Sequence, residues 1–172
     1  MNVRTCQWQI PFFVDVSEEN FIQQIRALGF VLNAQGELVW EGDADILLRP
    51  LKTNGGALSS GYRFVYVGNR LADCIAVIQL LLTMYPKAQV TGVECLVEDT
   101  VQNLLIQRAE RSNYMRGSMN GIYHAKQVGI VCMPNQLVLH VRRRIVKHQL
   151  DSIMSEVTNV KDDLIGEKFD LF

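Results

Sequence analysis

Residues 62–97, YRFVYVGNRLADCIAVIQLLLTMYPKAQVTGVECLV, decide the fold of this chain. The segment 62–67 is rich in aromatic and β-branched residues, which pack well on a pleated sheet. From residue 71 to residue 85 the chain is apolar on nearly every side of a helix, and such a helix belongs in a protein core or in a membrane. Pro86 stops the helix, and residues 90–97 resume an extended pattern. The stretch therefore predicts a buried helix between two strands.

The segment before this stretch predicts a strand, a helix and a hairpin. Residues 3–14 have the composition of a strand, which Pro11 either places at a sheet edge or splits in two. Ser17 is a good N-cap for a helix that Gly29 ends. Short strands are expected at residues 37–40 and 46–49, and a loop over residues 53–61 leads into the strand at 62–67.

The segment after this stretch predicts a helix, a strand and a long C-terminal helix. A capping-box pattern starts a helix at Asp99 that runs to about residue 115, and residues 123–133 resemble one strand. Residues 136–160 are most simply an amphipathic helix, although residues 137–141 could equally be a strand. No internal repeat is visible.

Together these elements predict an α+β fold. We expect a single domain over residues 1–160, with a mixed or antiparallel sheet covered by about three to four helices. An acidic tail over residues 161–172 follows it.

Apolar residues recur along the C-terminal helix in steps of four and three. They are Val146, Leu150, Ile153, Val157, Val160 and Leu164, which we call the apolar stripe. This spacing is typical of a coiled-coil seam, but it covers fewer than three heptads, which favours packing on the sheet. The alternative is an interface between two copies, made by Val146, Leu150, Ile153, Val157 and Val160. On that basis we expect a homo-oligomer.

The composition is that of an ordinary globular protein, with 172 residues, 48% hydrophobic and 20% charged. The longest apolar run, residues 75–84, is too short to span a bilayer, so no membrane association is expected. The N-terminal residues do not resemble a signal peptide. Four cysteines lie far apart without a CxxC pair, which argues against structural zinc and favours a reducing, cytoplasmic location.

The net charge of −1 hides an uneven distribution along the chain. Residues 101–150 hold eight basic residues and one acid, net +7, whereas the segments on either side each have a net charge of −4. Such asymmetry indicates contact with a polyanion, or an acidic tail that lies on a basic patch.

The basic segment supplies the candidate nucleic-acid-binding residues. Arg142, Arg143, Arg144 and Lys147 come within six residues, and Arg108, Arg111 and Arg116 could extend the patch. Arginine forks pair with phosphate oxygens in a bidentate manner. Tyr114 and Tyr123 flank a glycine-containing turn and are candidates for stacking on bases. The alternative is a solvated face whose arginines pair with Asp151, Glu156 or the acidic tail. No RRM, KH, zinc-finger or P-loop pattern accompanies the cluster.

Other side chains with chemical potential are better explained as structure. Tyr62, Phe64 and Tyr66 alternate along one strand and could stack on bases, but a core role is favoured. Glu41, Asp43 and Asp45 lack the EF-hand pattern and suit a solvated turn. The histidines His124, His140 and His148 are not at metal-ligand spacing. We therefore expect no metal, no cofactor and no catalytic residue.

These observations favour a non-enzymatic protein that binds RNA or DNA through residues 101–150 and acts as an accessory or assembly factor. One alternative is a protein adaptor or chaperone that uses the apolar stripe and the C-terminal tail. Another is a small enzyme whose site forms only in space, for example from His124 or His140 with a carboxylate or Cys132.

Overall fold

The computed structural model describes residues 6–43, 45–51, 60–68, 71–98, 122–125 and 127–165. The first elements along the chain are β1 (Cys6–Val14), α1 (Glu18–Leu28), β2 (Phe30–Leu32), β3 (Leu38–Trp40), β4 (Ile46–Pro50), β5 (Ser60–Val67) and α2 (Leu71–Met84). They are followed by β6 (Gln89–Val90), β7 (Val93–Glu98), β8 (Ile122–Ala125), β9 (Val128–Met133), β10 (Gln136–Val141) and α4 (Lys147–Ile165). The α+β class and the C-terminal helix are thus confirmed.

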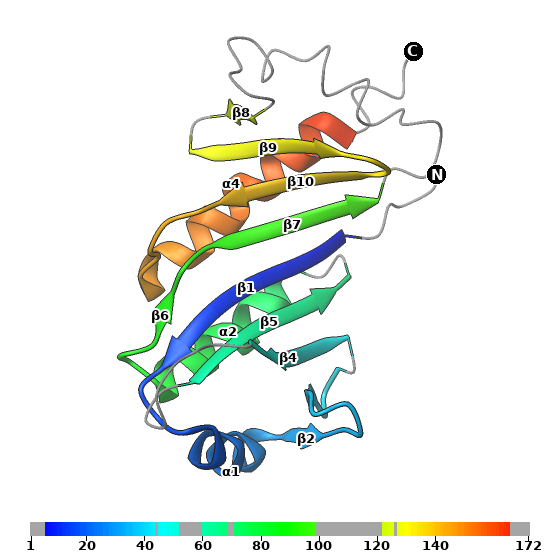
Figure 1. Cartoon of the computed structure of the whole chain (residues 1–172). Coiled ribbons are helices and arrows are strands. Elements are labelled where there is room, and N and C mark those ends of the chain that lie inside the picture. Colours follow the sequence, from blue (N-terminus) through cyan, green and yellow to red (C-terminus); the bar gives the residue numbers. More distant parts are fainter. Residues whose placement is uncertain are drawn as a thin grey trace.

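All described strands join one antiparallel sheet, in the order β2-β3-β4-β5-β1-β7-β10-β9-β8, with β6 paired to β1 (Figure 1). The order is similar on the two sides of the central pair β1–β7, with four strands beyond β1 and three described strands beyond β7. β1 and β7 lie side by side, each is flanked by the strand that precedes a helix (β5 or β10), and hairpin partners follow outward. The sheet therefore consists of two similar halves, a structural repeat that the sequence does not reveal.

The two halves also bury their helices in the same way. In α2 the buried residues include Cys74, Val77, Ile78 and Leu81, and in α4 they include Leu150, Ile153, Met154 and Val157. The spacing is the same in both helices, although the residue types differ. The spacing of the buried residues alone sets which face of a helix packs on the sheet, so the same packing can recur with different residue types.

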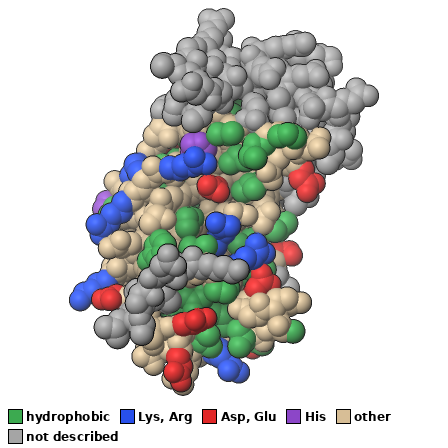
Figure 2. Space-filling model, viewed as in Figure 1, with side chains coloured by type: hydrophobic (Ala, Val, Ile, Leu, Met, Phe, Trp, Pro, Cys, Tyr) green, Lys and Arg blue, Asp and Glu red, His purple; other side chains and the backbone are tan. Residues whose placement is uncertain are grey.

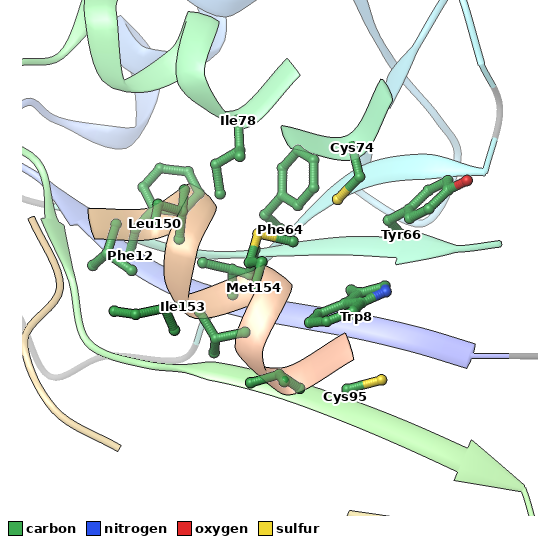
Figure 3. Packing of buried hydrophobic residues seen from close by; sticks show 14 of the residues in the cluster. Trp8, Phe12, Phe64, Tyr66, Cys74, Ile78, Cys95, Leu150, Ile153 and Met154 are labelled. Carbon is green, nitrogen blue, oxygen red and sulfur yellow. The ribbon is translucent and has the colours of Figure 1, made fainter. Parts of the chain in front are cut away.

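Helices α2 and α4 lie on the same face of the sheet and share its core (Figures 1 and 3). Leu150, Ile153 and Met154 of α4 pack near Trp8 and Phe12 of β1. Each fully buried aliphatic side chain of this kind contributes about 1.5–3 kcal/mol relative to exposure. The apolar stripe is therefore core from Leu150 to Leu164, the first of the two interpretations of its spacing, whereas Val146 precedes α4 and is exposed. The aromatic residues of β5 are buried in the core as well.

Pro11 lies in β1, which is a central strand and not an edge strand. The sheet tolerates a proline there because the N–H that proline lacks falls where pairing between the strands is interrupted. The Pro11 C=O accepts a hydrogen bond from the Thr91 N–H at 3.1 Å. Both backbone groups of a strand residue point to the same side, so the Pro11 nitrogen also faces Thr91 and Gly92. Pairing between β1 and β7 ends at Gln9–Glu94, and pairing between β1 and β6 begins at Phe12–Val90, so Pro11 lies between the two paired stretches. A bulge thus accommodates the proline.

Two predictions for the second half of the chain are wrong. The single strand expected at 123–133 is the hairpin of β8 and β9. The helix expected from residue 136 begins only at Lys147, and the alternative of a strand at residues 137–141 is confirmed, because residues 136–141 form β10 and pair with both β7 and β9. β10 is covered on both faces, so it lacks the polar–apolar alternation that identifies a half-exposed strand.

Two further differences concern α2 and α4. Helix α2 has the expected bounds but is buried on one face only, since Leu80 is 41% exposed. Helix α4 continues to Ile165, so residues 161–165 of the predicted tail are helical and Leu164 is buried.

The N-cap of α1 is confirmed, with the Asn20 N–H donating to Ser17 Oγ at 3.3 Å. The helix predicted at 99–115 and residues 166–172 of the tail lie outside the described residues.

We expect Gly129→Ala to destabilise the fold by forcing apart a cross-strand pair. Gly129 of β9 lies opposite His140 of β10, and a Cβ at residue 129 would stand 2.6 Å from His140 Nε2. Overpacking of this kind costs about 1–3 kcal/mol. Urea unfolding of Gly129→Ala, His140→Ala and the double variant measures the coupling. The double variant should recover most of the loss caused by Gly129→Ala, and additive effects would contradict the assignment.

Candidate functional site

Within residues 101–150, the basic residues that the structure describes lie in the link between β10 and α4 and at the first residue of α4. Arg142, Arg143, Arg144 and Lys147, which we call the basic connection, are all exposed. The three arginines follow the last residue of β10 and precede α4, so the expectation that they lie on a helix is wrong. Ile145 is buried, and its N–H donates to Val90 O at 2.9 Å. That anchor and the end of β10 force the arginines outward. Basic side chains gather on this side of the molecule (Figure 2).

Arg142 makes a weak ion pair. Its Nε lies 3.8 Å from Glu94 Oε1, and the side chains of Arg142 and Glu94 are 61% and 31% exposed. An ion pair with that much solvent around it contributes at most about 1 kcal/mol, so the guanidinium remains available to another anion.

Arg143 is positioned by neutral groups. Gln127 Oε1 accepts hydrogen bonds from Arg143 Nη2 at 2.8 Å and from Nε at 3.3 Å. The amide of Gln127 in turn donates to Glu156 Oε2 at 2.7 Å. Gln127 therefore stands between the guanidinium and the carboxylate and orients Arg143 without neutralising it.

Internal ion pairs explain only a small part of the cluster. Within the described part of the chain, Arg143, Arg144 and Lys147 have no carboxylate within ion-pair distance, and Lys147 Nζ donates instead to Thr83 Oγ1 at 2.5 Å. The expected alternative of pairing with Asp151 or Glu156 is therefore not what these residues show.

The start of α4 is an unfavourable place for these charges. The helix begins at Lys147 and has no acidic residue in its first turn, whereas α1 has Glu18 and Glu19 there. A cation at this end of a helix opposes the helix dipole, at a cost of about 0.3–1 kcal/mol each. Packing therefore does not account for the accumulation of positive charge.

A cavity of about 250 Å³ opens beside the basic connection. One wall is the end of α2 and the turn into β6, and the other is the stretch from Arg144 to Lys147. Its lining comprises Leu82, Thr83, Tyr85, Pro86, Lys87, Ala88, Val90, Arg144, Ile145, Val146 and Lys147. We call it the basic cavity, because three of these side chains are cationic and none is a carboxylate. Lys87, from the acidic half of the sequence, is a residue that the charge pattern missed.

The remaining predicted site residues are not brought together by the described structure. Arg108, Arg111, Arg116 and Tyr114 lie outside the described residues, and Tyr123 lies on β8, opposite Ile130, with its side chain outside the description. Of the five residues of the predicted interface, Leu150, Ile153, Val157 and Val160 are buried within the chain itself. They are covered by the sheet and are not presented to a second chain. Val146 is exposed.

The described residues contain no cluster of side chains that could hold a metal ion. No group of three or more His, Cys, Asp or Glu side chains among them converges on one point. The Asp43 carboxylate accepts the Asp45 N–H at 2.9 Å and so closes its own turn. His140 is buried in β10, His148 is exposed on α4, and neither lines the basic cavity.

The buried thiols differ in their ionisation. A hydrogen bond from Cys95, with the Lys161 ammonium nearby, lowers the pKa of Cys6 against the effect of burial, and the pKa of Cys95 is raised by its bond to Cys6 and by burial. Burial alone raises the pKa of Cys74 to about 12. All three are buried, so they offer no surface to a substrate.

Comparison with known proteins adds no assignment: no family model, no curated protein and no solved structure matches the chain. Among the helices that the structure describes, none has the length and apolarity needed to cross a membrane.

We expect Cys74 to make the fold less stable at alkaline pH. Above the ordinary thiol pKa of 9.0, the unfolded chain loses this proton while the folded chain keeps it, up to a pKa of about 12. Stability therefore falls with rising pH, by about 1.4 kcal/mol per unit at most. Urea unfolding at pH 8 and pH 10.5 should show a smaller loss for Cys74→Ala than for the wild type, by about 2 kcal/mol.

Ile78→Ala is the matched control for this measurement, because it truncates the same buried face of α2 without removing a proton. It should lower stability equally at both pH values. The same pH dependence in Cys74→Ala and in the wild type would show that Cys74 does not control it.

Proposed function

We propose that this protein is a non-enzymatic nucleic-acid-binding accessory protein that contacts phosphate through the basic connection. The observation that carries the proposal is that four exposed cations occur within six residues, in the link after β10 and at the first residue of α4, and three of them have no carboxylate partner among the described residues. Arginine suits this role because its planar fork matches two phosphate oxygens, and it stays charged at any physiological pH.

The repeat within the fold supports a functional origin for these charges. The equivalent link in the first half, between β5 and α2, reads Gly68-Asn69-Arg70 and holds one basic residue. The first half thus joins its strand to its helix over three residues without an arginine cluster, whereas the second half uses five, from Arg142 to Val146. The positive charge of the second link is therefore not required by the architecture, and a partner with negative charge is a sufficient reason for it.

The proposal includes the rest of the basic segment and the setting of the protein. Arg108, Arg111 and Arg116 would extend the phosphate contacts, and Tyr114 and Tyr123 would stack on bases. We propose a single domain in a reducing, cytoplasmic environment, in keeping with the three buried thiols. Because most of the apolar stripe is buried, self-association of the folded protein would use other residues.

A protein adaptor is the second candidate, although it loses the apolar stripe as its surface. The observation that favours it is the outermost strand β2, where Val31 and Leu32 are 46% and 41% exposed. An apolar edge strand offers unpaired backbone groups and side chains to another chain. This surface becomes the better candidate if the protein does not bind nucleic acid.

The test is to measure binding to mixed-sequence single- and double-stranded RNA and DNA over a salt series. We expect log K to fall linearly with log salt, and the triple variant Arg142→Gln, Arg143→Gln, Arg144→Gln to bind more weakly. Its slope should be shallower by about 2 to 3, since each lost phosphate contact removes roughly 0.7–0.9.

The matched control changes the same charge elsewhere: Arg26→Gln, Arg49→Gln, Arg63→Gln. Thermal unfolding should establish that both triple variants remain folded. Equal slopes for the two triple variants would show that only net charge matters and would refute a specific basic connection. No binding even at about 50 mM salt, where phosphate contacts are strong, would refute the function itself.

A further inference from the structure

We propose that the basic cavity binds a single phosphate group, with Lys87, Arg144 and Lys147 as the residues that hold it. This deepens the proposed function, because a nucleic-acid strand is one source of the phosphate. The cavity does not depend on that function, however, since a free phosphate or a phosphomonoester carries the same group.

Backbone interactions, and not the charges, bring the two walls together. Val90 and Ile145 form an isolated antiparallel bridge, with the Ile145 N–H donating to Val90 O at 2.9 Å. The turn that carries Lys87 is closed by a hydrogen bond from the Ala88 N–H to Tyr85 O, also at 2.9 Å. These bonds fix the backbone on both sides of the cavity, and the three exposed cationic side chains extend from it.

The repulsion among these cations is not relieved within the described protein. No lining residue is acidic, and neither Lys87 nor Arg144 has a described carboxylate within ion-pair distance. Lys147 has only the Thr83 hydroxyl as a partner. Val90 and Ile145 of the lining are buried, whereas the three cations are exposed, so solvent screens part of their repulsion. An anion in the cavity would turn this unfavourable arrangement into a favourable one.

The size of the cavity limits the ligand to a small anion. Its volume of about 250 Å³ is below the roughly 300–1,000 Å³ of pockets that enclose drug-sized ligands. A single phosphate group fits within this volume. Lysines supply point charges, and the arginine fork can donate to two phosphate oxygens. The Thr83 hydroxyl donates to Gln79 O at 2.8 Å and accepts from Lys147 Nζ, so it positions Lys147 and does not itself donate to the ligand.

The experiment is a titration of the ¹⁵N-labelled full chain with sodium phosphate, followed by amide chemical shifts, against sodium chloride of equal ionic strength. Saturable shifts are expected at Lys87, Ala88 and residues 145–147 with phosphate only. Lys87→Gln should weaken phosphate binding about tenfold, the effect of losing one charge-assisted hydrogen bond. Arg26→Gln, on helix α1 and outside the cavity lining, is the charge-matched control and should leave it unchanged.

A second arm identifies the source of the phosphate. Oligonucleotides with a 5′-phosphate and with a 5′-hydroxyl are compared on wild type and Lys87→Gln. A preference for the 5′-phosphate that Lys87→Gln abolishes indicates a strand end. Equal binding of both strands, with an equal loss in Lys87→Gln, indicates an internal phosphodiester. Saturable phosphate shifts without nucleic-acid binding support the cavity with free phosphate as its ligand and refute the proposed function.

Two results would overturn the cavity proposal. One is that phosphate produces no saturable shifts beyond those of chloride. The other is that Lys87→Gln and Arg26→Gln bind phosphate equally. If nucleic acid still binds through Arg142–Arg144 in either case, the proposed function stands and only the cavity is refuted.

Discussion

The pairing of β1 with β7 is the constraint on which the rest of the structure depends. It joins the two halves of the sheet over Cys6–Gln9 and Glu94–Val97, and the interruption that follows, opposite Pro11, determines where the site forms. At this break Val90 of β6 pairs with Phe12 and also bridges Ile145, and a Cβ on Gly92 would stand 2.9 Å from Val141 O. The close approach at Gly92 brings the end of β10 against β6, and so brings the basic connection against the turn that carries Lys87.

Charge and packing therefore have separate origins in this protein. Apolar burial on one side of the sheet stabilises the fold, whereas the basic connection adds cations at the start of α4, where they oppose the helix dipole. A protein with marginal stability retains such a cost when the residues have another use. The neutral bonds between Gln127 and Arg143 fit this view, because they hold the guanidinium in place while leaving its charge for a partner.

Local signals in the sequence were read correctly where one residue decides the structure by itself. Ser17 and Gly29 delimit α1 because a hydroxyl caps the first N–H groups and glycine adopts the left-handed conformation, here at φ 115°. Tyr62, Phe64 and Tyr66 reach the core by alternation. For residues 136–141 a strand was only the second interpretation, because the run is apolar on both faces. Pairing with β7 and β9 is what makes it a strand and not part of a helix.

The sequence by itself determined the α+β class, the bounds of α1 and α2, and the excess of positive charge in residues 101–150, because these follow from local periodicity, capping and composition. Only the tertiary structure decided that the arginines leave the sheet as a link, that the apolar stripe is core, and that Lys87 joins Arg144 and Lys147. Those outcomes depend on pairing between residues far apart in the chain, such as Val90 with Ile145. The order of residues along the chain does not indicate such pairs. The structural repeat is also not visible in the sequence, because it preserves the spacing of buried residues and not the residue types.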